Sequence, residues 1–425
     1  MGVPQTIVPG GGQPELEVIG GARPDSFPLL DGARGLAALC VFCFHGWLVL
    51  RYSHMEEWAA RAGETPMRAI TSVIGASGPE AVAVFFSLSG FLLYRPFLAA
   101  RMAGADAPDL GRFALRRAAR ILPAYWFALV VLGLLGRGTG VFTLHGIRDY
   151  FLFGQIYSGK GSTWNNPVEP AWTICVEVSF YLFLPFWALF TARVTRGRAN
   201  PIRLEVLITL GLILASIGWK AWAVKHTTIH EAHQPLLVAL PATLDMFGAG
   251  FLLALLSVGK PRTAWQHAAG RLFGRPGVCV GLALVGYALL CLVTAPAGPF
   301  SPTWPVIALA GAVLKVPVAA LLIVPGVVLM RGGGSLGAVY RVKRIAWVGV
   351  VSYGFYIWHI ALLRWLNELI GRGTLSLGLL PLAIAGVMFV ALAIAAASWY
   401  WLERPVLRLA HTYKAATSNK AKVPV

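Results

Sequence analysis

The hydrophobic positions of this 425-residue chain gather into ten long apolar blocks separated by shorter polar segments. A helix needs about 17 to 25 residues to cross the hydrocarbon core of a bilayer. Each block is close to that length, and the third is the shortest. We therefore predict membrane-spanning helices near residues 35–50, 80–98, 121–135, 171–191, 204–224, 237–258, 278–293, 304–330, 345–365 and 377–402.

Composition agrees with this pattern, because 57% of the residues are hydrophobic, 13% are charged and the mean hydropathy is +0.67. Such a chain is too apolar for a soluble domain of its size. The predicted fold class is an all-α polytopic membrane protein, a bundle of about ten helices over 29–408. Residues 1–28 form a Gly- and Pro-rich lead without signal-peptide features, which we expect to be disordered, and 409–425 form a basic tail.

The distribution of charge predicts the orientation of the bundle. The formal net charge is +18, and most of the 36 Lys and Arg fall on the connections that ten spans place on the side of the N-terminus. The positive-inside rule then makes both termini cytoplasmic. The basic surface would meet anionic lipid headgroups or an anionic substrate. Nucleic acid is disfavoured as a partner because aromatic residues do not interleave with these charges.

The five cysteines lie in apolar blocks and are odd in number, so they predict no disulfide framework. Cys40 and Cys43 form a Cys-x-x-Cys, which in a spanning helix favours small packing residues over a redox pair or a metal site. We expect no metal.

Titratable residues inside predicted spans indicate functional positions, because each is costly in lipid. In "LLDGARGLAALCVFCFHGW", Arg34 and His45 are eleven residues apart, which places them on one helix face about 16 Å apart along the axis. Asp31 is close enough to pair with Arg34. We expect Arg34 at the cytoplasmic surface and His45 near mid-membrane. The pair suits a long substrate with an anionic head, or alternatively a snorkelling arginine and a core histidine.

Further candidates follow along the chain. Small Ser89 in "VFFSLSGFLLYRPF" would let a ligand approach, whereas Ser87 favours helix packing. Arg95 and Arg120 lie closest to the membrane plane among the basic residues and are predicted phosphate ligands. Glu177 forms a polar stripe with Thr173 and Tyr181, where a carboxylate would orient or charge a histidine.

The ninth span places Ser352, Tyr356 and His359 on one face, although His359 alone is more often a core residue. Asp245 and Lys315 are expected to neutralise one another. Glu403 and Arg404 favour a helix end at the interface. In the loop 136–170, "LHGIRDYFLFGQIY" predicts a short helix capping an outward cavity, and Trp172 near the outer face suits stacking on a sugar ring.

Taken in order, "LDGARGLAALCVFCFH", "FFSLSGFLLYRPF", "RRAARILPAYW", "AWTICVEVSFYLFLP", "SYGFYIWH" and "LERP" resemble acyltransferase family 3, the multispanning bacterial O-acyltransferases. The resemblance covers about residues 28–408. It implies a ten-helix fold that moves acyl groups from cytoplasmic acyl-CoA to hydroxyls, commonly of cell-surface carbohydrates or lipids, with Arg34 and His45 essential. Some relatives carry a further periplasmic domain, and others modify macrolides.

The resulting hypothesis is an O-acyltransferase of a bacterial inner (plasma) membrane that uses acyl-CoA, with acetyl-CoA favoured. Its donor would lie on Arg34, Arg95, Arg120 and Ser89, with His45 as general base and Glu177 stabilising the imidazolium. Its carbohydrate or glycolipid acceptor would contact Trp172, Tyr181, Ser352, Tyr356 and His359. The alternatives are a transporter or flippase for an acyl or glycan carrier, and an acyltransferase acting on a macrolide-type small molecule. The sequence does not predict the acyl length or the oligomeric state. It also does not distinguish direct transfer from a relay through a covalent acyl-enzyme.

Overall fold

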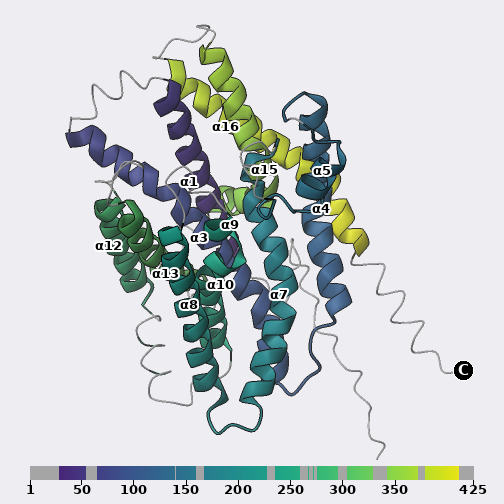
Figure 1. Cartoon of the computed structure of the whole chain (residues 1–425), viewed down its shortest axis with the longest axis vertical. Coiled ribbons are helices and arrows are strands. Elements are labelled where there is room, and N and C mark those ends of the chain that lie inside the picture. Colours follow the sequence, from purple (N-terminus) through teal and green to yellow (C-terminus); the bar gives the residue numbers. More distant parts are fainter. Residues whose placement is uncertain are drawn as a thin grey trace, which may run out of the picture.

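The computed structural model describes residues 28–53, 65–138, 140–158, 167–226, 235–258, 267, 271, 275–294, 304–328, 342–371 and 379–410. Within these residues every regular element is helical (Figure 1). The long helices are α1 (Pro28–Ser53), α3 (Thr65–Met102), α4 (Leu110–Leu134), α7 (Trp172–Thr195), α8 (Pro201–His226), α10 (Leu240–Ser257), α12 (Pro276–Thr294), α13 (Trp304–Val328), α15 (Lys343–Gly371) and α16 (Leu380–Ser398).

Each of the ten predicted spans falls on one of these helices. By length and composition, eight of the long helices in the described residues can cross a membrane. Helix α1 is not among these eight, and the apolar part of α12, Gly277–Val293, is shorter. The chain is therefore a multi-pass all-α membrane protein, as predicted. Helix α3 begins at Thr65, well before the apolar block, because hydropathy marks only the lipid-facing part of a helix and not its polar extension. Of the predicted lead 1–28 and tail 409–425, residues 1–27 and 411–425 lie outside the described residues.

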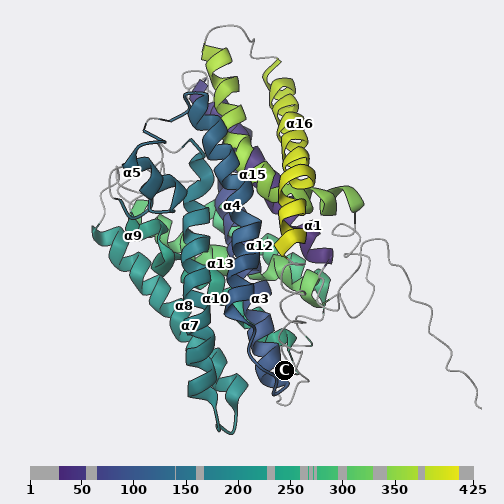
Figure 2. The ribbon, with the colours of Figure 1, turned by 90° about the vertical axis from the view of Figure 1, so that its right-hand side faces the viewer.

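Short elements complete the chain. They are α5 (Leu144–Gly146), the π-helical turn η1 (Ile147–Phe151), the 3-10 turn η2 (Glu169–Ala171), α9 (Pro235–Val238) and the π-helical turn η6 (Trp399–Glu403). The helical residues 144–151 confirm the short helix predicted in the loop 136–170. Seen from the side, α4, α7 and α8 stand beside one another and α16 lies across the molecule from α8 (Figure 2).

Glycines set the contact between α1 and α15. A Cβ atom added to Gly349 would lie 1.8 Å from the carbonyl oxygen of Asp31, and one added to Gly35 would lie 2.2 Å from that of Ile345. No side chain fits into such gaps, so these two glycines allow the helix backbones to touch. The α1–α15 crossing is therefore fixed by two positions.

Helices α1 and α15 run in the same direction, because their contacts advance together along both sequences. Beyond the glycine crossing, the rings of Phe42 and Phe355 lie 5.5 Å apart, and those of His45 and His359 lie 5.0 Å apart. Two parallel spans require an odd number of crossings between them. Seven long helices separate α1 from α15, so the parallel packing supports a crossing by each of them, α12 included.

The opposite side of the bundle is built on aromatic packing. The ring of Phe247 on α10 stacks on that of Phe180 on α7 with 3.8 Å between centroids, and on that of Phe86 on α3 with 4.8 Å. The hydroxyl of Ser87 donates to the carbonyl of Met246 at 2.9 Å, which confirms its predicted packing role. These contacts hold α3, α7 and α10 as one unit.

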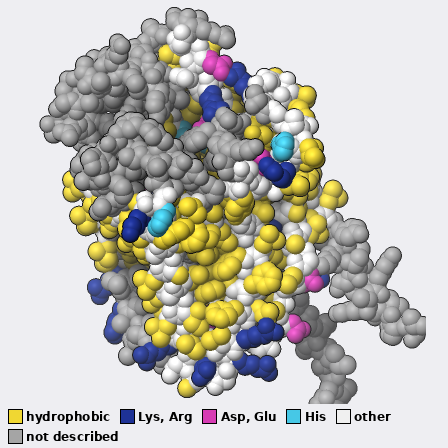
Figure 3. Space-filling model, in the orientation of Figure 1, with side chains coloured by type: hydrophobic (Ala, Val, Ile, Leu, Met, Phe, Trp, Pro, Cys, Tyr) yellow, Lys and Arg dark blue, Asp and Glu magenta, His cyan; other side chains and the backbone are white. Residues whose placement is uncertain are grey.

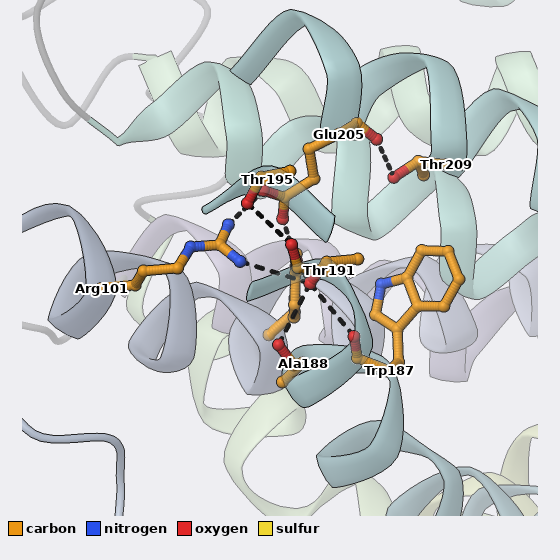
Figure 4. A network of polar contacts seen from close by, with 8 residues as sticks. Arg101, Trp187, Ala188, Thr191, Thr195, Glu205 and Thr209 are labelled. Carbon is orange, nitrogen blue, oxygen red and sulfur yellow. Dashed lines mark hydrogen bonds and ion pairs between the residues drawn. The ribbon is translucent and has the colours of Figure 1, made fainter. Parts of the chain in front are cut away.

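A polar network joins α3, α7 and α8 near the basic end of the bundle (Figure 4). The buried carboxylate of Glu205 accepts from the hydroxyl of Tyr94 and pairs with the guanidinium of Arg101. Thr191 receives a contact from Arg101 at 3.3 Å and lies 3.0 Å from the hydroxyl of Tyr94. Glu205 thus ties α8 to α3, and Thr191 joins α7 to the same network. The sequence signal for this network is Glu205 itself, a charge inside an apolar span that was not weighed.

The surface agrees with a membrane protein. Hydrophobic side chains cover the middle of the molecule, and Lys and Arg gather at its lower end (Figure 3). Exposed Arg196 and Arg198 in the α7–α8 connection and exposed Arg203 at the start of α8 belong to a predicted cytoplasmic segment.

Candidate active site

Two histidines from different helices meet inside the bundle. Nε2 of His359 lies 3.1 Å from Nδ1 of His45, which itself lies 2.9 Å from the carbonyl oxygen of Val41. His359 is 1% exposed, whereas His45 is partly exposed. Both histidines are predicted site residues, but their contact is not predictable from the sequence. It depends on the register between α1 and α15, which the glycine crossing sets.

Two residues of the polar face predicted on α15, Ser352 and Tyr356, have different surroundings. The hydroxyl of Tyr356 lies 2.9 Å from that of Thr173 on α7, so the two predicted stripes meet. Ser352 is buried, and its hydroxyl donates to the carbonyl of Gly349 in its own helix at 2.8 Å. Tyr356 thus joins α7 to α15 one turn before His359.

Glu177 is the second predicted catalytic residue, and its neighbours are hydroxyls. Its Oε1 atom accepts from Ser89 at 3.0 Å and from Tyr181 at 2.6 Å. The guanidinium of Arg117 on α4 lies 5.9 Å from the ring centroid of Tyr181. In the described residues the hydrogen bonds of His45 go to Val41 and His359 and not to Glu177. The predicted assistance of Glu177 to His45 therefore stays a prediction.

Arg34 lies among charges contributed by three helices. Its Nη1 atom is 3.5 Å from Oδ1 of Asp31, as predicted, and Arg117, Arg120 and Glu177 also lie near enough to act on it electrostatically. The Arg34 side chain is 31% exposed, so its charge is open to a ligand.

This cluster is recessed within the bundle. Ser89 and Glu177 come 13 and 18 residues before the last residues of α3 and α7, which corresponds to roughly 20 and 27 Å of helix. Arg34 therefore does not lie level with the basic end, as the sequence suggested, because α3 and α7 extend far beyond it. The basic residues of α4 lead from that end toward the cluster.

Arg120, a predicted phosphate ligand, already has an anionic partner. Its Nη1 atom lies 3.1 Å from Oε2 of Glu403, which is 1% exposed. The guanidinium also lies 5.1 Å from the ring of Trp399 and 5.6 Å from that of Tyr353. The "LERP" segment, expected to mark only a helix end, thus neutralises Arg120 inside the bundle.

Arg117 and Arg95 differ from Arg120 in their surroundings. In the described part of the chain Arg117 forms no ion pair with a carboxylate, which leaves its charge available beside Arg34. Sequence analysis passed over it because Arg120 lies deeper along the same helix. Arg95 is partly buried on α3, and its predicted role stays a prediction.

A second set of buried charges lies in the other half of the bundle. Asp245 pairs with Lys220 of α8, not with Lys315 as expected. Asp245 and Glu80 of α3 both lie near enough to Lys315 to act on it electrostatically, and the carboxylate oxygens of Glu80 are buried. Lys220 is a charge within the fifth span, and including it among the titratable residues would have suggested this pairing.

The described part of the loop 136–170 packs onto α4 through its backbone. The carbonyl of Tyr150 accepts from the hydroxyl of Tyr125 at 3.0 Å, and Phe153, at a φ of 61°, stacks on the Tyr125 ring at 5.1 Å. Burial and the neighbouring Asp149 carboxylate raise the pKa of Tyr150. Trp172, predicted to stack on sugar, is partly buried against the core at the start of α7.

Cys40 and Cys43 are unpaired and exposed on α1. Their exposure argues against the predicted packing role.

Most of the chain is similar to known proteins. A family model described as an acyltransferase domain matches residues 27–400. No solved structure matches significantly.

Curated relatives are distant in sequence. The peptidoglycan O-acetyltransferase OatA of Listeria monocytogenes is 22% identical over 78% of this chain, which spans 48% of that protein, about half its length. The acyltransferase MdmB of Streptomyces mycarofaciens is 25% identical over 86% of this chain and 88% of its own. The exopolysaccharide production protein ExoZ of Rhizobium meliloti is 26% identical over 79% of this chain and 90% of its own.

Proposed function

We propose, since the chain belongs to this family of acyltransferase domains, that it moves a short acyl group from acyl-CoA to a hydroxyl of a cell-surface carbohydrate or glycolipid. The observation that carries the proposal is the construction of α1. Arg34, whose side chain is 31% exposed, lies near Arg117 and the carboxylates of Asp31 and Glu177 at one level of this helix. His45 lies beside a second imidazole about 16 Å further along it.

The donor fits along α1. Its phosphates would bind Arg34 and Arg117, since Arg120 is paired with Glu403. The pantetheine arm would follow α1 and bring the thioester to His45. Glu177, bonded to Ser89 and Tyr181, would hold the walls of the donor site in place.

The reaction then needs one base. His45 would take the proton of the acceptor hydroxyl through Nε2 while the hydroxyl oxygen attacks the thioester carbonyl. The carbon–sulfur bond breaks, and the CoA thiolate takes the proton from the imidazolium. Direct transfer predicts that no labelled acyl group stays on the protein when acceptor is absent.

The names of two relatives support a carbohydrate acceptor. One is named for peptidoglycan O-acetylation and another for exopolysaccharide production, which favours a carbohydrate over a macrolide-type acceptor. All three are bacterial, which favours a bacterial inner membrane as the location. Mass spectrometry of surface glycans from a deletion strain would show the loss of an ester on one polymer.

The assay is CoA release by purified protein in liposomes. We expect His45→Ala to abolish release and His226→Ala to leave it unchanged. His226 is a matched control, because its Nδ1 also lies near the carbonyl four residues earlier, at 2.7 Å from Trp222, but on an exposed helix end. CoA release by His45→Ala at the rate of the parent would show that His45 is not the general base.

Donor binding is tested separately. Arg34→Ala should raise the KM for acyl-CoA about tenfold or more, since a charge-assisted contact is lost, while Arg203→Ala on the exposed face of α8 should not. A transporter would instead accumulate labelled carrier in the liposomes without releasing CoA.

A further inference from the structure

The tautomer of His359 follows from its surroundings. Its Nδ1 atom lies 2.8 Å from the backbone carbonyl of Tyr356. A carbonyl oxygen can only accept, so this nitrogen carries the hydrogen, and in the neutral ring Nε2 then holds a lone pair. That lone pair faces Nδ1 of His45.

His45 has the complementary tautomer. Its Nδ1 atom faces two acceptors, the Val41 carbonyl at 2.9 Å and Nε2 of His359 at 3.1 Å. A lone pair on this nitrogen would repel both, so Nδ1 carries the hydrogen and shares it between them. Nε2 of His45 is left with the lone pair that a general base needs.

The groups around the pair are apolar or neutral. The His359 ring lies 6.1 Å from Phe355 and 6.4 Å from Phe42, between ring centroids, and 5.6 Å from Tyr356. In the described residues no carboxylate bonds to either histidine, so the position that an acid often occupies behind a catalytic histidine is taken by a second imidazole.

We infer that His359 is the positioning residue of the reaction, holding the His45 ring to α15 in the tautomer whose Nε2 accepts the acceptor's proton. This rests on the proposed function. The Val41 carbonyl ties the ring only to its own helix, whereas His359 fixes its orientation against a second one. When His45 becomes an imidazolium, neutral His359 accepts its Nδ1 hydrogen bond without itself gaining a proton. His359 is 1% exposed, so in this proposal it acts on the reaction through His45 and not, as the sequence suggested, by contacting the acceptor.

The test compares two replacements of His359. His359→Leu fills the space without an acceptor, and His359→Gln offers an amide oxygen near the position of Nε2. We expect Leu to lower kcat at least about tenfold with little change in the KM for acyl-CoA, and Gln to restore most of the loss. His226→Leu is the control for removing a histidine from a helix.

A second readout separates positioning from packing. In protein labelled with ¹⁵N-histidine, and with His45 signals assigned by their loss in His45→Ala, the parent and His359→Gln should show one His45 tautomer and His359→Leu a mixture. Unchanged kcat in His359→Leu, or equal losses in Leu and Gln with the tautomer unchanged, would overturn the inference. An active His45→Ala variant would instead overturn the proposed function.

Discussion

Arg120 and Glu403 show how a single contact decides between binding and structure. From sequence, Arg120 is a basic residue at the membrane plane and suits a phosphate. In the fold its guanidinium faces a carboxylate that is 1% exposed and two aromatic rings. A buried charge that loses its partner is strongly destabilised, whereas replacing both partners with apolar side chains is often neutral.

We therefore predict that Arg120→Met lowers the stability of the protein by about 3 to 5 kcal/mol, because Glu403 is left unpaired. The double variant Arg120→Met/Glu403→Met should recover most of this loss. Arg404→Met, which removes an exposed charge from the same turn, is the control. The measurement is thermal unfolding in detergent. If Arg120→Met kept the stability of the parent and raised the KM for acyl-CoA, Arg120 would be a phosphate ligand and not a structural partner of Glu403.

At the scale of elements, the α1–α15 crossing carries the site. Gly349 and Gly35 let the two backbones touch, and ten residues further along each helix the histidines meet. A methyl group at the crossing must push α1 from α15, and the displacement reaches the histidines because both helices are rigid.

Gly349→Ala is accordingly predicted to lower turnover about tenfold or more and to cost at least 1 to 3 kcal/mol in stability through overpacking. Gly371→Ala at the end of the same helix is the matched control, since a Cβ there meets nothing within 4 Å. CoA release and thermal unfolding, measured on both variants, check the prediction. A fully active Gly349→Ala variant would show that the contact of the two histidines does not depend on this crossing.

The same elements show how far sequence reasoning reaches. Hydropathy located all ten helices, and helical spacing placed Arg34 and His45 on one helix and Tyr356 beside His359, because these properties are local. The contacts of Glu177 with Ser89, of Arg120 with Glu403 and of Asp245 with Lys220 were missed, since each joins two different helices and depends on side-chain packing between them. The contact of His45 with His359 joins residues 314 positions apart, and only the register of the two glycine-packed helices determines it.

At the scale of the whole molecule, orientation links the site to its substrates. Parallel α1 and α15, with seven long helices between them, agree with ten crossings and with termini on one side. By the positive-inside rule, the exposed arginines of the α7–α8 connection predict that this end is cytoplasmic. Acyl-CoA would approach the cluster around Arg34 from there, and the acceptor would reach His45 from the opposite side.

This orientation predicts which single cysteines a membrane-impermeant maleimide reaches in intact spheroplasts. In a background with all five native cysteines replaced, His145→Cys in the outer loop should be labelled and Asn200→Cys in the α7–α8 connection should not; both positions are exposed in the fold. Detergent should make both react, which controls for local accessibility. Labelling of Asn200→Cys alone would show that the bundle has the opposite orientation. The cluster around Arg34 would then open toward the outside, where acyl-CoA is absent. That result would contradict both the topology and acyl-CoA as the donor.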